Sequence, residues 1–186
     1  MFNPDIYLFH LINNLAGRIP ALDTLGIFAA VFLLPLLAFL LVPMAFTVKR
    51  LREEHWWELP VKALIAAALG YGLRTVVGVV VARPRPFAAL ADVQPLISVE
   101  HLANSFPSGH ATLAFALAFM VFKKDRDWGL AFLILALLIG LGRVFVGVHY
   151  PLDIVGGAMM GWLAAVMVQW VERREWRKIE RALRVR

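Results

Sequence analysis

The sequence predicts an all-α membrane protein, a polytopic helical bundle of five transmembrane helices with an N-terminal interfacial helix. Three observations predict this fold class. The 186-residue chain is 61% hydrophobic and only 17% charged, a composition that a water-soluble surface of this size does not tolerate. Its apolar runs are about 20 residues long, the length that crosses a hydrocarbon core of roughly 30 Å. Short basic segments separate these runs, as in the connections of membrane proteins.

The N-terminal part of the chain is predicted as one short helix and one span. Residues 4–16 are amphipathic but too short to cross a bilayer, so we expect them to lie along the membrane interface. The first span is expected from Thr24 to Val48. Pro35 and Pro43 should kink it, because proline removes a backbone hydrogen bond from a helix.

Four further apolar segments complete the predicted bundle, at residues 58–82, 108–122, 128–148 and 151–171. No repeat or linker separates them, so residues 1–186 are predicted as a single membrane-embedded domain. The last residues, 172–186, form a basic tail that we expect to be an interfacial helix. The chain has no cysteine, which excludes disulfides and thiolate metal sites. No pattern in the sequence indicates an oligomeric state.

Lysine and arginine are unequally distributed between the two ends of the predicted bundle. In a five-span arrangement, one side carries most of the 19 basic residues, namely Lys49, Arg50, Arg52, Lys123, Lys124, Arg126 and those beyond Val171. Cytoplasmic connections are enriched in such residues. We therefore expect a multi-pass membrane protein with a cytoplasmic C-terminus, and with residues 83–107 facing outward. The net charge of +6 then reflects topology and contact with anionic lipid, and not nucleic-acid binding.

Three of the predicted spans bring polar side chains to a similar depth. At about 1.5 Å per residue, Ser108, Arg143 and Arg74 lie roughly 22 to 24 Å from the basic edge of their spans. A charge that faced lipid at this depth would be costly. These side chains should therefore point into the bundle and toward one another.

The first of three polar clusters, SFPSGH (105–110), opens the third span. Ser108 fits a helix N-cap, which leaves the amides of Gly109 and His110 as donors at the positive end of the helix dipole. Such a terminus binds phosphate well, and glycine allows a close approach to the backbone. The alternative is an ordinary N-cap followed by an incidental histidine.

The second cluster, ARPRPF (82–87), alternates arginine with proline. Arg83 and Arg85 could be interfacial anchors for lipid headgroups. Because proline restricts the backbone, however, each guanidinium is projected in a set direction, which suits bidentate binding of phosphate.

The third cluster, GRVFVGVHYPLD (142–153), places His149 four residues before Asp153. A carboxylate in the first helical turn can hold one imidazole nitrogen and leave the other with a free lone pair, as an oriented base or nucleophile requires. Alternatively, Asp153 balances the helix dipole and His149 is an interfacial residue. His110, His149 and Asp153 could also form a metal site. We expect no metal, because four arginines at the same level would repel a dication.

Together, the three clusters resemble the signature of the type 2 phosphatidic acid phosphatase superfamily, which also includes vanadium haloperoxidases. That signature has a lysine seven residues before Arg-Pro, then Pro-Ser-Gly-His, then Ser-Arg followed by a histidine and an aspartate. The matching positions, in order and spacing, are Arg85-Pro86, Pro107-Ser108-Gly109-His110, Arg143, His149 and Asp153. The chain departs from it in having Gly78 for the lysine and Gly142 for the serine. Arg74 lies one helical turn from Gly78 and is expected to replace the lysine's charge.

The resemblance implies a metal-free, cofactor-free lipid phosphatase that works through a phosphohistidine. His149 would be the nucleophile, Asp153 would orient it, and His110 would be the general acid and base. The phosphate ligands would be Arg85, Ser108, Gly109, Arg143 and, in place of the lysine, Arg74.

The substrate implied is a membrane lipid phosphate. The chain is similar to bacterial undecaprenyl pyrophosphate phosphatases of the bacitracin-resistance type, whose N-terminus also has an Ile-Asn segment before Leu-Asp, as in Ile12-Asn13 and Leu22-Asp23. Phosphatases of phosphatidylglycerophosphate, phosphatidic acid and lipid A share the same motifs and stay open as alternatives. A non-enzymatic lipid-phosphate carrier would not need the His-Asp pair, and a haloperoxidase would not need the apolar spans.

Overall fold

The computed structural model describes the backbone of residues 3–48, 55–99 and 104–184, and the side chains of these ranges as far as Arg174. These residues form helices and no strand, as predicted. The helices are α1 (Pro4–Asn13), α2 (Pro20–Val31), α3 (Leu33–Thr47), α5 (Glu58–Val81), α6 (Pro86–Ala89), α7 (Gly109–Lys124), α8 (Arg126–Phe145) and α9 (Pro151–Arg184).

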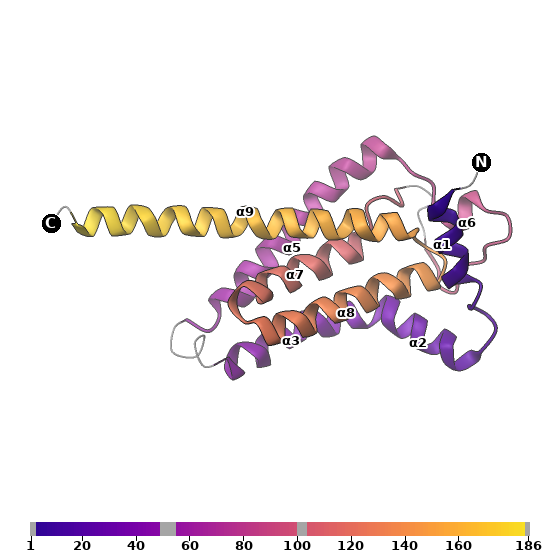
Figure 1. The fold of residues 1–186 in the computed structure, drawn as a ribbon, viewed down its shortest axis with the longest axis horizontal. Coiled ribbons are helices and arrows are strands. Elements are labelled where there is room, and N and C mark those ends of the chain that lie inside the picture. The colour runs from indigo at the N-terminus through magenta and orange to yellow at the C-terminus, as the bar shows by residue number, and fades with distance from the viewer. Residues whose placement is uncertain (1–2, 49–54, 100–103, 185–186) are drawn as a thin grey trace.

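The helix α7 lies at the centre of an elongated bundle. It packs against α5, α8 and α9, and α1 and α6 lie at one end of the bundle (Figure 1). Most side chains of α7 are buried, and its 16 residues make it the shortest of the four helices of this core. Close packing here depends on small residues, because alanines alternate with larger side chains at Ala111, Ala114, Ala116 and Ala118.

The first predicted span is a broken one. Instead of one kinked helix, α2 and α3 form a pair bent by 56° around Phe32. The cause is Pro35, whose ring clashes with the carbonyl four residues earlier, and that carbonyl belongs to Val31, the last residue of α2. Pro43 lies inside α3 without ending it.

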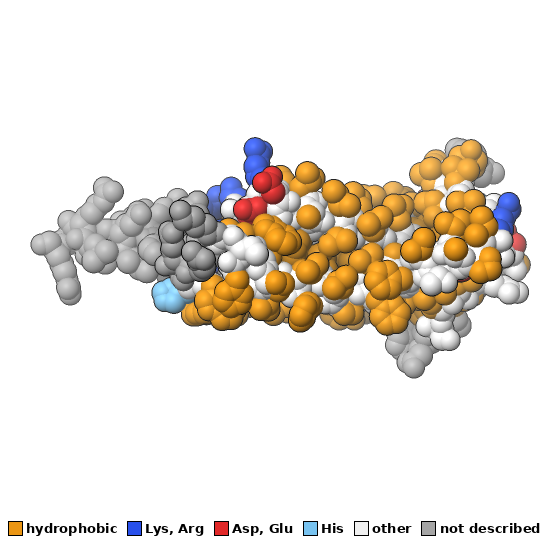
Figure 2. All heavy atoms as spheres, turned by 90° about the horizontal axis from the view of Figure 1, so that it is seen from below, with side chains coloured by type: hydrophobic (Ala, Val, Ile, Leu, Met, Phe, Trp, Pro, Cys, Tyr) orange, Lys and Arg blue, Asp and Glu red, His pale blue; other side chains and the backbone are white. Residues whose placement is uncertain are grey.

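The protein is a membrane protein. Three helices are long and apolar enough to span a bilayer, with bounds Glu58–Ala89, Arg126–Phe145 and Pro151–Arg174, and the bent pair of α2 and α3 would be a further span. Apolar side chains cover the middle of the face in Figure 2, and charged ones lie toward its ends. The α7 helix is shorter than these spans and is shielded by them. The arrangement of five spans and one interfacial helix therefore stays a prediction.

The end of the bundle away from α1 carries a network of charges. Lys62 donates hydrogen bonds to Glu58 at 2.7 Å and to Glu172 at 3.0 Å, and Lys124 lies 3.6 Å from the same Glu172 carboxylate. Lys49, Arg50 and Arg52 and the side chains of the tail from residue 175 lie outside the described residues. The predicted sidedness thus stays a prediction. The tail's backbone as far as Arg184 continues α9 directly.

The short helix α1 packs against the end of the bundle and contributes buried side chains to it. Phe9 is fully buried, with its ring 5.5 Å from that of Tyr150, and Asp5 is only 5% exposed. Asp5 accepts a 2.9 Å hydrogen bond from the amide of Leu152, so both residues join α1 to the segment that begins α9. The predicted helix therefore exists, with a tertiary role that its amphipathic pattern did not reveal.

Candidate active site

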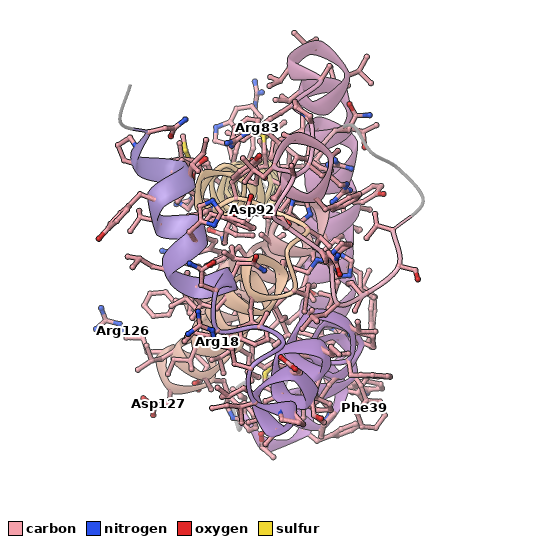
Figure 3. The ribbon with its side chains drawn as sticks, turned by 90° about the vertical axis from the view of Figure 1, so that its right-hand side faces the viewer. Arg18, Phe39, Arg83, Asp92, Arg126 and Asp127 are labelled. Carbon is pink, nitrogen blue, oxygen red and sulfur yellow. The ribbon has the colours of Figure 1, made fainter. Side chains whose placement is uncertain are left out.

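The three polar clusters meet at the end of the bundle that α1 covers. The C-terminal ends of α5 and α8 and the N-terminal ends of α7 and α9 lie there, together with α6. Figure 3 views the bundle from this end, with Arg83 labelled beside α1. Local backbone features direct the chain into the site: α5 ends at Ala82 in the left-handed conformation (φ 46°), and Gly147 (φ 82°) turns the chain after α8.

The start of α9 holds Asp153 in a fixed position. Pro151 is the first residue of the helix, where its missing N–H costs no hydrogen bond. Asp153 lies in the first turn, and its Oδ2 accepts a hydrogen bond of 2.8 Å from the amide of Tyr150. The carboxylate thus reaches back over the helix start, as in a capping box. Two side chains from distant parts of the sequence also bind this carboxylate: Arg83 donates to Oδ1 and Ser105 to Oδ2.

His149 is held through one imidazole nitrogen. Its Nδ1 lies 3.5 Å from Asp153 Oδ2 and 3.4 Å from Ser105 Oγ, and the Ser105 hydroxyl donates a 2.5 Å hydrogen bond to the same Oδ2. His149 is 2% exposed, and the other two side chains are fully buried. Because a carboxylate only accepts, the neutral imidazole places its proton on Nδ1 and its lone pair on Nε2.

The other nitrogen of His149 faces a cation. Arg85 Nη1 lies 3.3 Å from Nε2 and also donates a 3.0 Å hydrogen bond to the carbonyl of Val148. Burial lowers the pKa of His149 to about 4, and the nearby charges of Arg143 and Arg85 act in the same direction. The imidazole is therefore neutral near pH 7, which a nucleophile or general base requires.

The two arginines of the Arg-Pro cluster have different partners. Arg83 donates to Asp153 Oδ1 at 2.8 Å and to Asp5 Oδ2 at 2.6 Å, and its guanidinium lies 3.9 Å from the centre of the Tyr150 ring. Arg83 is thus bound by carboxylates, whereas Arg85 faces His149. The Arg-Pro pattern suggested phosphate binding for both arginines, but Arg83 presents its guanidinium to Asp5 and Asp153 instead.

Two further guanidiniums, those of Arg143 and Arg74, lie at the site with N–H donors that are not hydrogen-bonded to any described residue. Arg143 is 7% exposed and donates to the carbonyl of Ala30 at 3.4 Å, and Arg74 donates to the carbonyl of Asn104 at 3.4 Å. Within the described part of the chain, the Nε atoms of both are buried without a hydrogen-bond partner. Unpaired donors of like charge in a buried site are expensive, and a bound anion would satisfy them.

His110 and Arg74 approach this group from α7 and α5. Arg143, His149 and Arg85 are close enough to His110 for their charges to interact with it, and Arg74 interacts in the same way with Arg85. Arg74 Nη1 would lie 3.7 Å from a methyl group placed on Gly109, so this guanidinium reaches the start of α7. His110, His149, Arg85, Arg143 and Arg74 are thus brought together. A common depth was predicted for only two of these, Arg74 and Arg143.

Ser108 caps α7, as the sequence predicted. Its Oγ accepts from the amide of Ala111 at 3.5 Å, and its own amide donates to the carbonyl of Asp153 at 2.9 Å, which ties α7 to α9. The hydroxyl hydrogen of Ser108 can still be donated to a ligand. The amides of Gly109 and His110 belong to the first turn, where helix geometry provides no acceptor.

Two residues of the site were not predicted. Ser105 belongs to the SFPSGH cluster, so its type and position offered a signal, but its hydrogen bond to Asp153 spans 48 residues of sequence. Asp5 offered no signal, because nothing local marks one carboxylate in an N-terminal helix as the partner of Arg83.

The site favours an anion over a cation. Among the described residues, no three histidine, aspartate or glutamate side chains are grouped so that they could hold a metal ion. The three guanidiniums of Arg74, Arg85 and Arg143 and the start of α7 all present donors. This is the donor set that recognises phosphate groups.

Known proteins are similar to this chain in sequence or in fold. The model of the PAP2 superfamily matches residues 59–177. The bacitracin transport permease protein BcrC of Bacillus licheniformis is 34% identical over 166 residues, which cover 89% of this chain and 79% of the relative. The putative undecaprenyl-diphosphatase YbjG of Escherichia coli K12 is 33% identical over 172 residues, or 90% and 82% of the two chains. The crystal structure of Aquifex aeolicus LpxE superposes with a TM-score of 0.69 and 29% sequence identity. The match covers 90% of this chain and 96% of LpxE.

This chain belongs to the PAP2 superfamily. It is a membrane-embedded hydrolase, a phosphatase that acts on lipid phosphates. The resemblance that the three sequence clusters indicated is confirmed.

Proposed function

We propose that this phosphatase removes the terminal phosphate of undecaprenyl diphosphate at the outer face of a bacterial cell membrane, through a phosphohistidine on His149. The observation that carries the mechanism is the orientation of His149, whose Nδ1 faces Asp153 and Ser105 while Nε2 faces Arg85. The substrate is supported by the relatives whose names include undecaprenyl-diphosphatase.

In the first step, the lone pair of His149 Nε2 attacks the terminal phosphorus. The bond from that phosphorus to the bridging oxygen breaks as the N–P bond forms. His110 donates a proton to the departing oxygen, which leaves as undecaprenyl phosphate. Asp153 stabilises the positive charge that develops on the imidazole.

In the second step, a water molecule attacks the phosphorus of the phosphohistidine. His110, now neutral, accepts a proton from this water. The N–P bond breaks, its electrons return to Nε2, and inorganic phosphate is released. The two steps together consume one water molecule and regenerate both histidines.

The phosphoryl oxygens are bound by the guanidiniums of Arg85, Arg143 and Arg74 and by Ser108 and the amides of Gly109 and His110. Phosphoryl transfer depends mostly on positioning and charge stabilisation. Arg74 takes the place of the family's lysine. Its side chain is long enough to pass Gly78, where a methyl group would lie 3.5 Å from Nη2, and to reach Gly109 at the start of α7.

The outward orientation is supported by the distribution of basic residues. Lys62, Lys124 and the C-terminal end of α9 lie at the opposite end of the bundle from the site. A site near headgroup depth lets the lipid's phosphate enter while its chain stays in the bilayer. Phosphatidylglycerophosphate, phosphatidic acid and lipid A are alternative substrates with the same headgroup chemistry.

The test is phosphate release in detergent from undecaprenyl diphosphate, phosphatidylglycerophosphate and phosphatidic acid, with and without EDTA. We expect the highest kcat/KM with the diphosphate, no effect of EDTA, inhibition by vanadate, and loss of turnover in His149→Ala. After an alkaline quench, the wild type should retain substrate phosphate as an acid-labile adduct that His149→Ala lacks. Activity that needs a divalent cation, or an active His149→Ala variant, would refute the mechanism. A preference for another lipid would refute only the substrate.

A further inference from the structure

An ion-pair chain runs from the N-terminal helix to the carboxylate beside His149. Arg83 bridges Asp5 of α1, at 2.6 Å, and Asp153 of α9, at 2.8 Å, with one Nη atom for each carboxylate. Asp5 is 5% exposed and Asp153 is fully buried. Charge-assisted bonds of this length in a buried setting are strong and directional.

In this chain of ion pairs, the two oxygens of Asp153 bind different partners. Arg83 occupies Oδ1, which leaves Oδ2 for Ser105, the amide of Tyr150 and His149. The carboxylate is therefore prevented from rotating about its own axis. A fixed Oδ2 keeps the Nδ1–H of His149 in place and so directs Nε2.

Asp5 also holds the backbone that carries these groups. Its Oδ1 accepts a 2.9 Å hydrogen bond from the amide of Leu152, in the first turn of α9. Phe9, one turn further along α1, is packed against Tyr150. One carboxylate from α1 thus contacts both the arginine that holds Asp153 and the helix start on which Asp153 is placed.

The charge of Asp5 matters as well as its shape. Because Arg83 is shared between two carboxylates, it neutralises the negative charge of Asp153 less than it would if it were paired with Asp153 alone. The charged or titratable groups described around His149 are Asp153 from α9, Arg85 at the start of α6, His110 from α7, Arg143 from α8 and, next to Arg85, Arg74 from α5. Arg83, Asp5 and Tyr150 lie behind Asp153. The cations outnumber the anions, so the loss of one carboxylate would further disfavour an imidazolium.

We propose that Asp5 is a positioning residue for the reaction, acting through Arg83 and Leu152 to hold Asp153 and, through it, His149. This proposal rests on the proposed role of His149 as the nucleophile. It gives α1 a function in catalysis, although no atom of α1 needs to touch the substrate.

The deciding variant is Asp5→Asn, which keeps an oxygen for the Leu152 amide but loses the charge that balances Arg83. With undecaprenyl diphosphate in detergent, we expect kcat to fall roughly 10-fold, with KM changed by less than about twofold, because the loss is one of orientation and basicity and not of phosphate binding. Asp5→Glu, which retains the charge, should recover part of the lost kcat. The matched control is Asp92→Asn, because Asp92 pairs with α1 through His10 at 3.9 Å and is 71% exposed.

A second readout separates positioning from simple loosening. In phosphate-free micelles, the NMR titration midpoint of the His149 imidazole should move to lower pH in Asp5→Asn, because an anion has been removed. Loosening of α1 would let water reach His149, and its pKa would then rise toward the ordinary value of about 6.5.

The outcomes are distinct. Unchanged kcat in Asp5→Asn, an equal loss in Asp92→Asn, or a midpoint that moves upward would overturn the proposal for Asp5. If His149→Ala were still active, the proposed function would fail first. If His149→Ala is inactive and Asp5→Asn behaves like wild type, only the role of Asp5 is refuted.

Discussion

The hydroxyl of Ser105 donates a 2.5 Å hydrogen bond to Asp153 Oδ2, the same oxygen that lies 3.5 Å from His149 Nδ1. Asp153 therefore meets His149 with a carboxylate that is already fixed by a neutral donor on one oxygen and by Arg83 on the other. An imidazole next to so constrained an acceptor has one favourable orientation.

Asp153→Asn should reduce kcat by roughly 10³ to 10⁴. The amide has the same shape, but its NH₂ group can donate toward Nδ1 and favour the wrong tautomer of His149. Phosphate release from undecaprenyl diphosphate measures the loss. Similar thermal unfolding of the variant and the wild type would show that the fold is intact, and a kcat within about tenfold of wild type would contradict the proposed role.

Ser105→Ala should lower kcat by about tenfold and leave KM nearly unchanged. The change removes one hydrogen bond to Asp153, which costs about 1 to 2 kcal/mol in a buried site. The measurement is steady-state turnover, with Ser98→Ala as a matched control because Ser98 is an exposed serine of the same connection. An equal effect of both substitutions would argue against a specific role for Ser105.

Arg74→Ala should raise KM and lower kcat/KM by at least tenfold, because one of the cations around the phosphate is lost. Arg74→Lys should retain much of the activity, since it places the family's usual charge one turn away from its usual position. Arg18→Ala, an exposed arginine elsewhere in the chain, is the control. If Arg74→Ala matched wild type while Arg85→Ala was inactive, Arg74 would not be the replacement for the lysine at Gly78.

The imidazole of His149 should titrate near pH 4 in the free protein, because its burial lowers the pKa to about 4. The group is thus mostly neutral at pH 5, whereas an ordinary histidine would be mostly charged at that pH. NMR of ¹⁵N-labelled histidine in phosphate-free micelles measures the titration, and comparison with His149→Ala assigns the signal. A midpoint near 6.5 would show that His149 is open to solvent.

Much of the fold was readable from local pattern. Apolar length located α5, α8 and α9, with the start of α9 at Pro151 as predicted, and the Ser108 cap located the start of α7. The break between α2 and α3 was expected only as a kink, because the clash of Pro35 with the carbonyl of Val31 can either bend or end a helix. Packing against the rest of the bundle decides between these outcomes.

The sequence alone determined the membrane class, the helical architecture and the chemical types in the site, because hydropathy, caps and motif spacing are properties of neighbouring residues. Only the tertiary structure decided the partners. Arg83 and Arg85 are two residues apart and locally equivalent, yet Arg83 pairs with Asp5 and Asp153, 78 and 70 residues away, while Arg85 faces His149. Such choices depend on which helix ends meet, and that is settled by the packing of the whole bundle around α7.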